Sequence, residues 1–168
     1  YHRGATDFEV MTTMAKGLRA KLAETASLAR GDIADMQQST DGTAKWLVRN
    51  VDGALIESVH IPEDDRGTLC VSSQVGCTLN CRFCHTGTMK LVRNLTPGEI
   101  VGQVLLARDS LGEWPKGSMA GLDEVEDSAE YTSDARLLTN IVMMGMGEPL
   151  YNFDNVKGAL KLVMDGDG

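Results

Sequence analysis

The sequence lacks any long apolar run. No stretch approaches the roughly 20 consecutive apolar residues that a membrane-spanning helix requires, and no basic-then-apolar leader opens the chain. The second absence carries little weight, because the chain begins at Tyr1 rather than at a methionine. We therefore expect no membrane partner, and we interpret the chain as a piece of a longer protein.

The sequence also lacks an excess of positive charge, and its cysteines are not spread along the chain. The chain has 16 Lys and Arg against 24 Asp and Glu, a net charge of −8, which argues against a broad nucleic-acid-binding surface on this stretch without excluding one. Much of the acidity falls in residues 122–130, which we interpret as a solvated surface insertion. Three of the four cysteines share one loop, unlike the framework of a secreted mini-protein. The sequence thus predicts a reducing, cytoplasmic setting.

The stretch that stands out is GCTLNCRFCHTG, residues 76–87, in which the cysteines have the spacing Cys77-x3-Cys81-x2-Cys84. Thiolates on one short loop can converge on a soft metal, and they select iron–sulfur clusters, zinc or cuprous copper. Three cysteines on a four-iron cluster would leave one iron free of protein ligands, and an open metal position is where a substrate or cofactor binds.

Other interpretations of these cysteines stay open at this point. A structural zinc site needs a fourth ligand, for which His85 and Cys70 are badly spaced. The subset Cys81-x2-Cys84-His85 matches a haem c attachment pattern but ignores Cys77. A redox dithiol at Cys81 and Cys84 lacks the flanking strand and helix of a thioredoxin pattern.

The first half of the chain predicts a helix and then strands. Thr6 and Glu9 fit a capping box that begins an amphipathic helix over 7–26, with its methionines as core filler. Gly31 and the polar residues 37–43 indicate a boundary. Residues 45–61 predict two strands around an Asp-Gly turn, and residues 68–75 predict a strand that leads into the cysteine loop.

The second half predicts β-α units. Thr96, Pro97 and Glu99 begin a helix that Gly112 ends. Residues 137–144 predict a buried parallel strand, and residues 152–164 another helix. The fold class is therefore α/β, the first part of a parallel (β/α) barrel preceded by a helical segment and a β-hairpin, with its sites at the carboxyl ends of strands. We divide the chain into a helical accessory domain (1–40), a linking hairpin (41–62) and a core (63–168).

Four segments together resemble one family: RGTLCVSSQVGC (66–77), CRFC (81–84), RNL (93–95) and VMMGMGEPL (142–150). They are similar to the RlmN/Cfr family, radical S-adenosylmethionine enzymes that methylate adenine in RNA. C-x3-C-x2-C is the signature of that superfamily. The opening YHRG (1–4) also resembles the accessory domain of RlmN members.

The resemblance implies roles for particular residues. It implies that Cys77, Cys81 and Cys84 ligate a [4Fe–4S] cluster, and that Gly147 and Glu148 lie along the amino group of S-adenosylmethionine. In addition, it implies that Cys70 is the resolving thiol, through a transient disulfide, and that Glu57 is the proton acceptor. Phe83 and Trp46 could stack on a base, although core packing is the simpler interpretation of Trp46, and His85 is expected to pack or hydrogen-bond beside the loop.

The resemblance also implies an activity and partners. RlmN members methylate C2 of one adenosine in 23S rRNA and of one in tRNA, through a methyl-cysteine and a 5′-deoxyadenosyl radical; the alternatives are Cfr-like methylation at C8 and a zinc-stabilised binding module. We expect an electron donor such as flavodoxin and a monomeric protein. In the family the methyl-carrying cysteine lies beyond the position of Gly168, so we expect this chain alone to be inactive.

Overall fold

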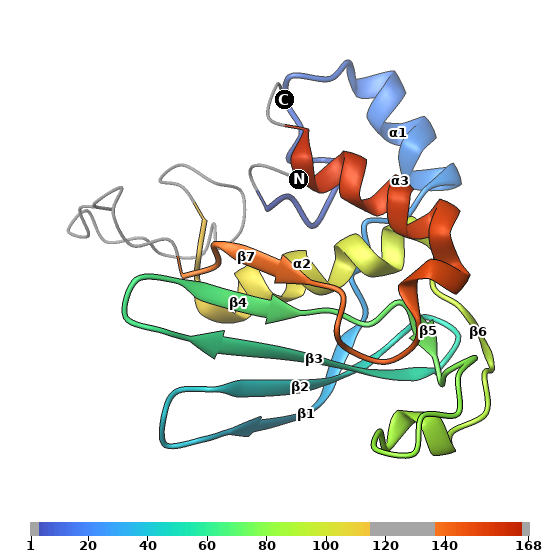
Figure 1. Ribbon diagram of the computed structural model, residues 1–168. Helices are drawn as coiled ribbons and strands as arrows, with labels where there is room; N and C mark the ends of the chain where they lie inside the picture. The colour runs from blue at the N-terminus through green and yellow to red at the C-terminus, as the bar shows by residue number, and fades with distance from the viewer. Residues whose placement is uncertain (1–3, 115–136, 166–168) are drawn as a thin grey trace.

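The computed structural model describes residues 4–114 and 137–165, and within them the α-helices lie on one side of the main sheet (Figure 1). The five-stranded sheet has the order β1-β2-β3-β4-β7, and a two-stranded sheet pairs β5 with β6. The acidic run at 122–130 lies outside the described residues. The elements are α1 (Lys16–Thr25), β1 (Asp32–Gln38), β2 (Ala44–Arg49), β3 (Leu55–Pro62), β4 (Gly67–Cys70), β5 (Gln74–Val75), η1 (Thr86–Thr88), β6 (Arg93–Asn94), α2 (Pro97–Leu111), β7 (Asn140–Val142), η2 (Pro149–Asn152) and α3 (Phe153–Met164).

The predicted hairpin is confirmed. β2 and β3 pair antiparallel around the Asp52-Gly53 turn, with Leu47 opposite Glu57. The sequence did not predict β1, whose residues are all exposed and show no inside-outside alternation. β1 nevertheless pairs with β2, with an irregularity between Ile33 and Asp35. Part of the stretch that we interpreted as a boundary therefore belongs to the same sheet as the hairpin.

The first helix is shorter than the sequence predicted. α1 begins at Lys16, and residues 7–14 form turns instead. The backbone N–H of Glu9 bonds to Oδ1 of Asp7 at 2.8 Å, so a local side-chain turn replaces the predicted capping box. No residue of α1 is buried. The methionines of the predicted helix, Met11 and Met14, precede α1 and do not join the core, so their interpretation as core filler is wrong.

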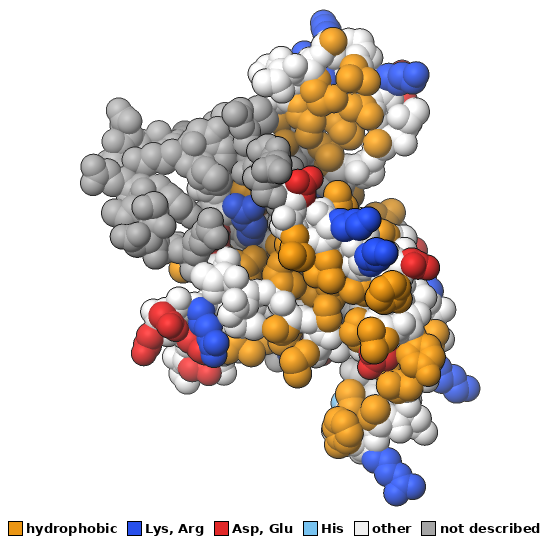
Figure 2. Space-filling view, turned by 45° about the horizontal axis from the view of Figure 1, so that its top comes forward, with side chains coloured by type: hydrophobic (Ala, Val, Ile, Leu, Met, Phe, Trp, Pro, Cys, Tyr) orange, Lys and Arg blue, Asp and Glu red, His pale blue; other side chains and the backbone are white. Residues whose placement is uncertain are grey.

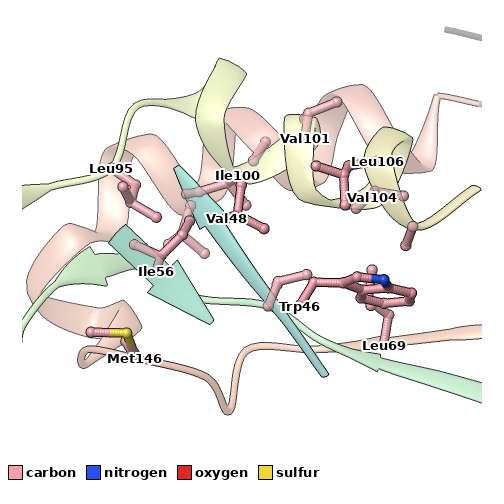
Figure 3. Packing of buried hydrophobic residues seen from close by; sticks show 14 of the residues in the cluster. Trp46, Val48, Ile56, Leu69, Leu95, Ile100, Val101, Val104, Leu106 and Met146 are labelled. Atoms are coloured by element: carbon pink, nitrogen blue, oxygen red, sulfur yellow. The ribbon is translucent and has the colours of Figure 1, made fainter. Parts of the chain in front are cut away.

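Helix α2 has the boundaries that the sequence predicts. Thr96 and Glu99 form a reciprocal capping box at its start, and Gly112 ends it in the left-handed conformation. The buried face of α2 packs on the sheet in one apolar core (Figure 3). Trp46 lies in this core and is 1% exposed, which confirms it as a packing residue. The core includes Val48, Ile56, Leu69, Leu95, Ile100, Val101, Val104, Leu106 and Met146.

Strand β7 supplies the parallel part of the sheet. It pairs with β4 in parallel, and Cys70 and Val142, the last residues of the two strands, lie opposite each other. Both strands are shorter than the sequence predicted: the predicted strand over 68–75 divides into β4 and β5, and the ladder within 137–144 covers Asn140–Val142. The carboxyl ends of β4 and β7 therefore meet at one edge of the fold, where such sheets place their sites.

Helix α3 lies beside α2, where a Cβ on Gly158 would come within 3.2 Å of Cγ of Pro97. Its other face is apolar and exposed, and Figure 2 shows hydrophobic side chains gathered on this side of the molecule. None of the described helices is long and apolar enough to cross a membrane.

The two faces of the main sheet differ. Ile56, Ser58 and His60 of β3 are buried on the helix side, whereas Glu57 points to the opposite face. No helix of the described ranges covers that opposite face (Figure 1). Cys70 lies on the same uncovered face as Glu57. It pairs with Val59, and Val59, two residues after Glu57 in β3, points to the same side of the sheet.

Candidate metal centre and cofactor site

The two ends of the cysteine loop are held against each other, next to the pair of strands β5 and β6. Gly76 begins it with φ +76°, and a Cβ there would lie 2.1 Å from the carbonyl oxygen of Lys90. Cys77 forms a bridge with Lys90, and the N–H of Val92 donates to the carbonyl of Val75 at 2.8 Å. The close approach of the two backbones explains why the position before the first cysteine is a glycine.

The second and third cysteines share one turn. The N–H of Cys84 donates to the carbonyl of Cys81 at 3.2 Å, and the N–H of Gly87 donates to the carbonyl of Cys84 at 3.1 Å. A Cβ on Gly87 would lie 2.7 Å from the carbonyl oxygen of Cys81, so this glycine lets the turn close. Sγ of Cys77 accepts the N–H of Leu79 at 3.3 Å, the kind of bond that tunes cluster sulfurs.

All four cysteines are free thiols of intermediate burial. Among the described residues no group of three or more His, Cys, Asp and Glu side chains is arranged to hold a single ion. His85 is exposed, and its backbone carbonyl, rather than its ring, accepts bonds from Thr88. The three thiols share one loop, and in the described part of the chain no fourth ligand completes a closed site with them. These residues therefore suit an iron–sulfur cluster held by three cysteines better than a closed zinc site.

A second loop follows β7 and lies against the segment between β4 and β5. The N–H of Gly145 donates to the carbonyl of Val71 at 3.0 Å, and the N–H of Met146 donates to Oγ of Ser72 at 2.8 Å. Gly147 has φ +96°, which favours glycine. The carboxylate of Glu148 accepts the N–H of Leu150 at 3.2 Å and is a suitable partner for an ammonium group.

The structure therefore brings two predicted parts of the site together. Gln74 links the cysteine loop to the second loop, because its side chain bonds both Thr78 and the N–H of Glu148. The sequence did not single out Gln74. A glutamine at the start of a strand carries no local signal, and its partner Glu148 is 74 residues away.

Cys70 and Glu57 form a separate pair on the open face of the sheet. Cys70 lies opposite Val59, so Glu57 is its diagonal neighbour, about 7 to 8 Å away by the usual strand geometry. Burial raises the pKa of the Cys70 thiol above its ordinary 9.0. Oγ of Ser72 donates to the carbonyl of Glu57 at 2.6 Å, which ties this strand to the segment that follows Cys70.

The fold and the three-cysteine loop define a radical S-adenosylmethionine core. Residues 71–167 match the family model of the Radical SAM superfamily, and the chain belongs to this superfamily. Residues 1–28 match the N-terminal domain of the ribosomal RNA large subunit methyltransferase. The resemblance to the RlmN/Cfr family is thereby confirmed, and a [4Fe–4S] cluster and S-adenosylmethionine are the cofactors that it implies.

Curated relatives cover the whole chain. It is 72% identical over 168 residues to the dual-specificity RNA methyltransferase RlmN of Erythrobacter litoralis, and covers 40% of that protein. It is 70% identical to the protein of the same name from Novosphingobium aromaticivorans, and covers 41% of it. A crystal structure of a radical SAM methyltransferase from Sphaerobacter thermophilus superposes with a TM-score of 0.79 at 41% identity, over 100% of this chain and 44% of that one. The chain thus spans about two fifths of its relatives.

Proposed function

We propose that the full-length protein carrying this chain methylates C2 of an adenosine in 23S rRNA and in tRNA. The observation that carries the proposal is the three-cysteine loop held directly beside the Gly147–Glu148 loop. It is supported by the names of the relatives, which are dual-specificity RNA methyltransferases over the whole of this sequence.

The residues divide the work between the two loops. Cys77, Cys81 and Cys84 would hold the cluster, and the carboxylate of Glu148 with the Gly147 backbone would hold the amino group of S-adenosylmethionine. When bound, these cofactors supply a carbon radical, which suits C2 of adenine because an aromatic C–H there offers neither a nucleophile nor an acidic proton. The positive φ and close packing of Gly147 bring the second loop close to its partner.

The open face of the sheet would receive the base. Glu57 would accept the proton that leaves the methylated adenine, because its side chain is 45% exposed and lies on that face. Cys70 would release the product by attacking the sulfur of the methyl-carrying cysteine of the remaining protein: a transient disulfide forms, the bond from that sulfur to the carbon on the adenine breaks, and this carbon takes up a proton to become the methyl group. The pKa of Cys70 is raised by burial, so the thiol holds its proton at neutral pH until it reacts.

Other parts of the proposal concern partners and location. The protein would be a cytoplasmic monomer, and an electron donor such as flavodoxin would serve it. The Cfr-like alternative differs in the carbon that is methylated, and the match of residues 1–28 to the RlmN-type N-terminal domain favours C2. A zinc-stabilised binding module is disfavoured by the superfamily membership.

Mass spectrometry of nucleosides tests the proposal. RNA treated with the anaerobically reconstituted full-length protein should contain 2-methyladenosine, in a 23S rRNA fragment and in tRNA. Finding 8-methyladenosine alone would show a Cfr-like enzyme, and finding no methyladenosine with a loaded cluster would refute the proposed activity.

A further inference from the structure

The side chain of Gln74 is a buried amide with both of its ends bonded. It is 1% exposed, and its Nε2 donates to Oδ1 of Asn94 at 2.7 Å and to Oγ1 of Thr78 at 3.0 Å. Its Oε1 accepts the backbone N–H of Glu148 at 3.0 Å. Because a backbone N–H can only donate, this bond fixes the orientation of the amide.

The partners of this amide belong to the two halves of the site. Thr78 lies between the first and second cysteines of the loop, and its N–H also approaches Oε1 of Gln74 at 3.4 Å. Glu148 is the residue that we assign to the amino group of S-adenosylmethionine. Between them, a Cβ on Gly147 would come within 2.5 Å of Cβ of Gln74, so the second loop rests directly on this side chain.

We infer that Gln74 is a positioning residue that sets the separation between the cysteine loop and the Gly147–Glu148 loop. The inference rests on the proposed function, in which S-adenosylmethionine must reach the cluster and Glu148 at the same time. A ligand held at two points binds best when the two points are already spaced correctly, because the protein then needs no reorganisation. Gln74 supplies that spacing from β5, with one side chain bonded to both loops.

Neighbouring polar residues dock the second loop without touching the first. Oγ of Ser72 accepts the N–H of Met146 at 2.8 Å, and Nδ2 of Asn152 donates to the carbonyls of Ser73 and Leu95 at 2.7 and 2.8 Å. Loss of the Gln74 amide would therefore leave the second loop attached to the sheet but remove its side-chain link to Thr78. The expected defect is in cofactor affinity rather than in folding.

The test uses the full-length protein with Gln74→Met, which keeps the length of the side chain and removes its amide. The control is Ser58→Ala, since Ser58 is 0% exposed and its side chain bonds to Gln103, a residue of neither loop. Equilibrium dialysis of the reconstituted proteins should show Kd for S-adenosylmethionine raised roughly tenfold by Gln74→Met, as expected for one or two lost hydrogen bonds, with the iron content unchanged. The control should shift Kd less than twofold.

Hydrogen exchange provides a readout that needs no cofactor. The backbone amide of Glu148 should exchange roughly tenfold faster in Gln74→Met than in wild type, because the Oε1 atom that accepts its N–H is lost. Unchanged exchange and Kd in Gln74→Met, or an equal rise of Kd in the control, would overturn the inference. A wild type that takes up no iron would instead refute the proposed function, while the exchange of Glu148 would still decide the role of Gln74.

Discussion

Nζ of Lys45 lies 3.2 Å from Oε1 of Glu57, across the pairing of β2 and β3. The two side chains are 40% and 45% exposed, and an exposed pair of this kind contributes at most about 1 kcal/mol. The carboxylate of Glu57 is therefore oriented by Lys45 without being withdrawn from solvent. It stays open on the sheet face that also carries Cys70.

This pair predicts unequal effects of two substitutions. In the full-length protein Glu57→Gln should lower the rate of methyladenosine formation about a hundredfold or more, the usual range for loss of a proton acceptor. Lys45→Met should change the rate only a few-fold and the stability by less than about 1 kcal/mol. Initial rates and thermal melts measure both, and equal losses of activity would contradict the assignment of Glu57.

Removal of the Cys70 thiol should stop the reaction at a late stage. Cys70→Ala leaves the β4 ladder intact, so the protein should fold and load its cluster normally. Because this thiol is assigned to product release, a covalent protein–RNA species should accumulate and survive denaturing electrophoresis. Wild-type product yield from Cys70→Ala would contradict the role.

The thiol of Cys70 should also lose its proton at a higher pH than an ordinary cysteine. Burial raises its pKa above 9.0, so its alkylation by iodoacetamide should keep accelerating as the pH rises through 9.0. Mass mapping of the alkylated peptide at several pH values measures this. A rate that levels off below pH 8.5 would show that the thiol is not desolvated.

Arg93, in strand β6, links that strand to the hairpin turn and to helix α2. Its guanidinium bonds Asp52 of the hairpin turn at 2.7 Å and Glu99 of α2 at 2.6 Å. Burial alone would raise the pKa of Glu99, but the hydrogen bonds from Arg93 and Thr96 together outweigh it and lower the pKa below 4.5. The stabilisation from Glu99 is therefore present above pH 4.5 and lost as the pH falls through its lower native value.

Thermal melts of wild type and Glu99→Gln measure this effect. The variant should melt at a lower temperature at pH 6, and the difference should shrink as the pH falls below 4.5. A difference in melting temperature that stays constant across this range would show that the carboxylate of Glu99 makes no ionised contribution.

Gly53 and Gly147 have similar backbone conformations but different surroundings, so replacing each by alanine distinguishes the cost of backbone strain from the cost of a steric clash. Gly53 and Gly147 have φ +84° and +96°, but a Cβ on Gly53 meets nothing within 4 Å, whereas one on Gly147 lies 2.5 Å from Gln74. Gly53→Ala should cost about 1 to 2 kcal/mol from its backbone alone. Gly147→Ala should cost more and weaken binding of S-adenosylmethionine, as denaturant titration and equilibrium dialysis would show. Equal losses of unfolding free energy in the two variants would mean that the second loop moves to accommodate the added Cβ without a penalty.

The sequence predicted those elements whose signals are local. The Asp-Gly hairpin and the capping box at Thr96 and Glu99 each lie within a few residues, and both are confirmed. β1 was missed because its exposed edge position imposes no alternation. The predicted start of the first helix failed because Asp7 takes the N–H of Glu9, a competition that composition does not reveal.

The sequence predicted only part of the site, for a similar reason. The cysteine spacing marks three candidate ligands directly, and the resemblance implied roles for Glu57, Cys70, Gly147 and Glu148. Gln74 could not be found in this way, because its importance comes from contacts with Thr78, Asn94 and Glu148, which only the fold brings together.

Iron content after anaerobic reconstitution tests the central claim most directly. The full-length protein should bind roughly four irons per chain, with the visible absorption of thiolate-to-iron charge transfer. The cluster should be lost when Cys77, Cys81 and Cys84 are all replaced by serine, and kept in Cys70→Ser. Tight binding of zinc without iron uptake, or a cluster that survives the triple replacement, would contradict the account.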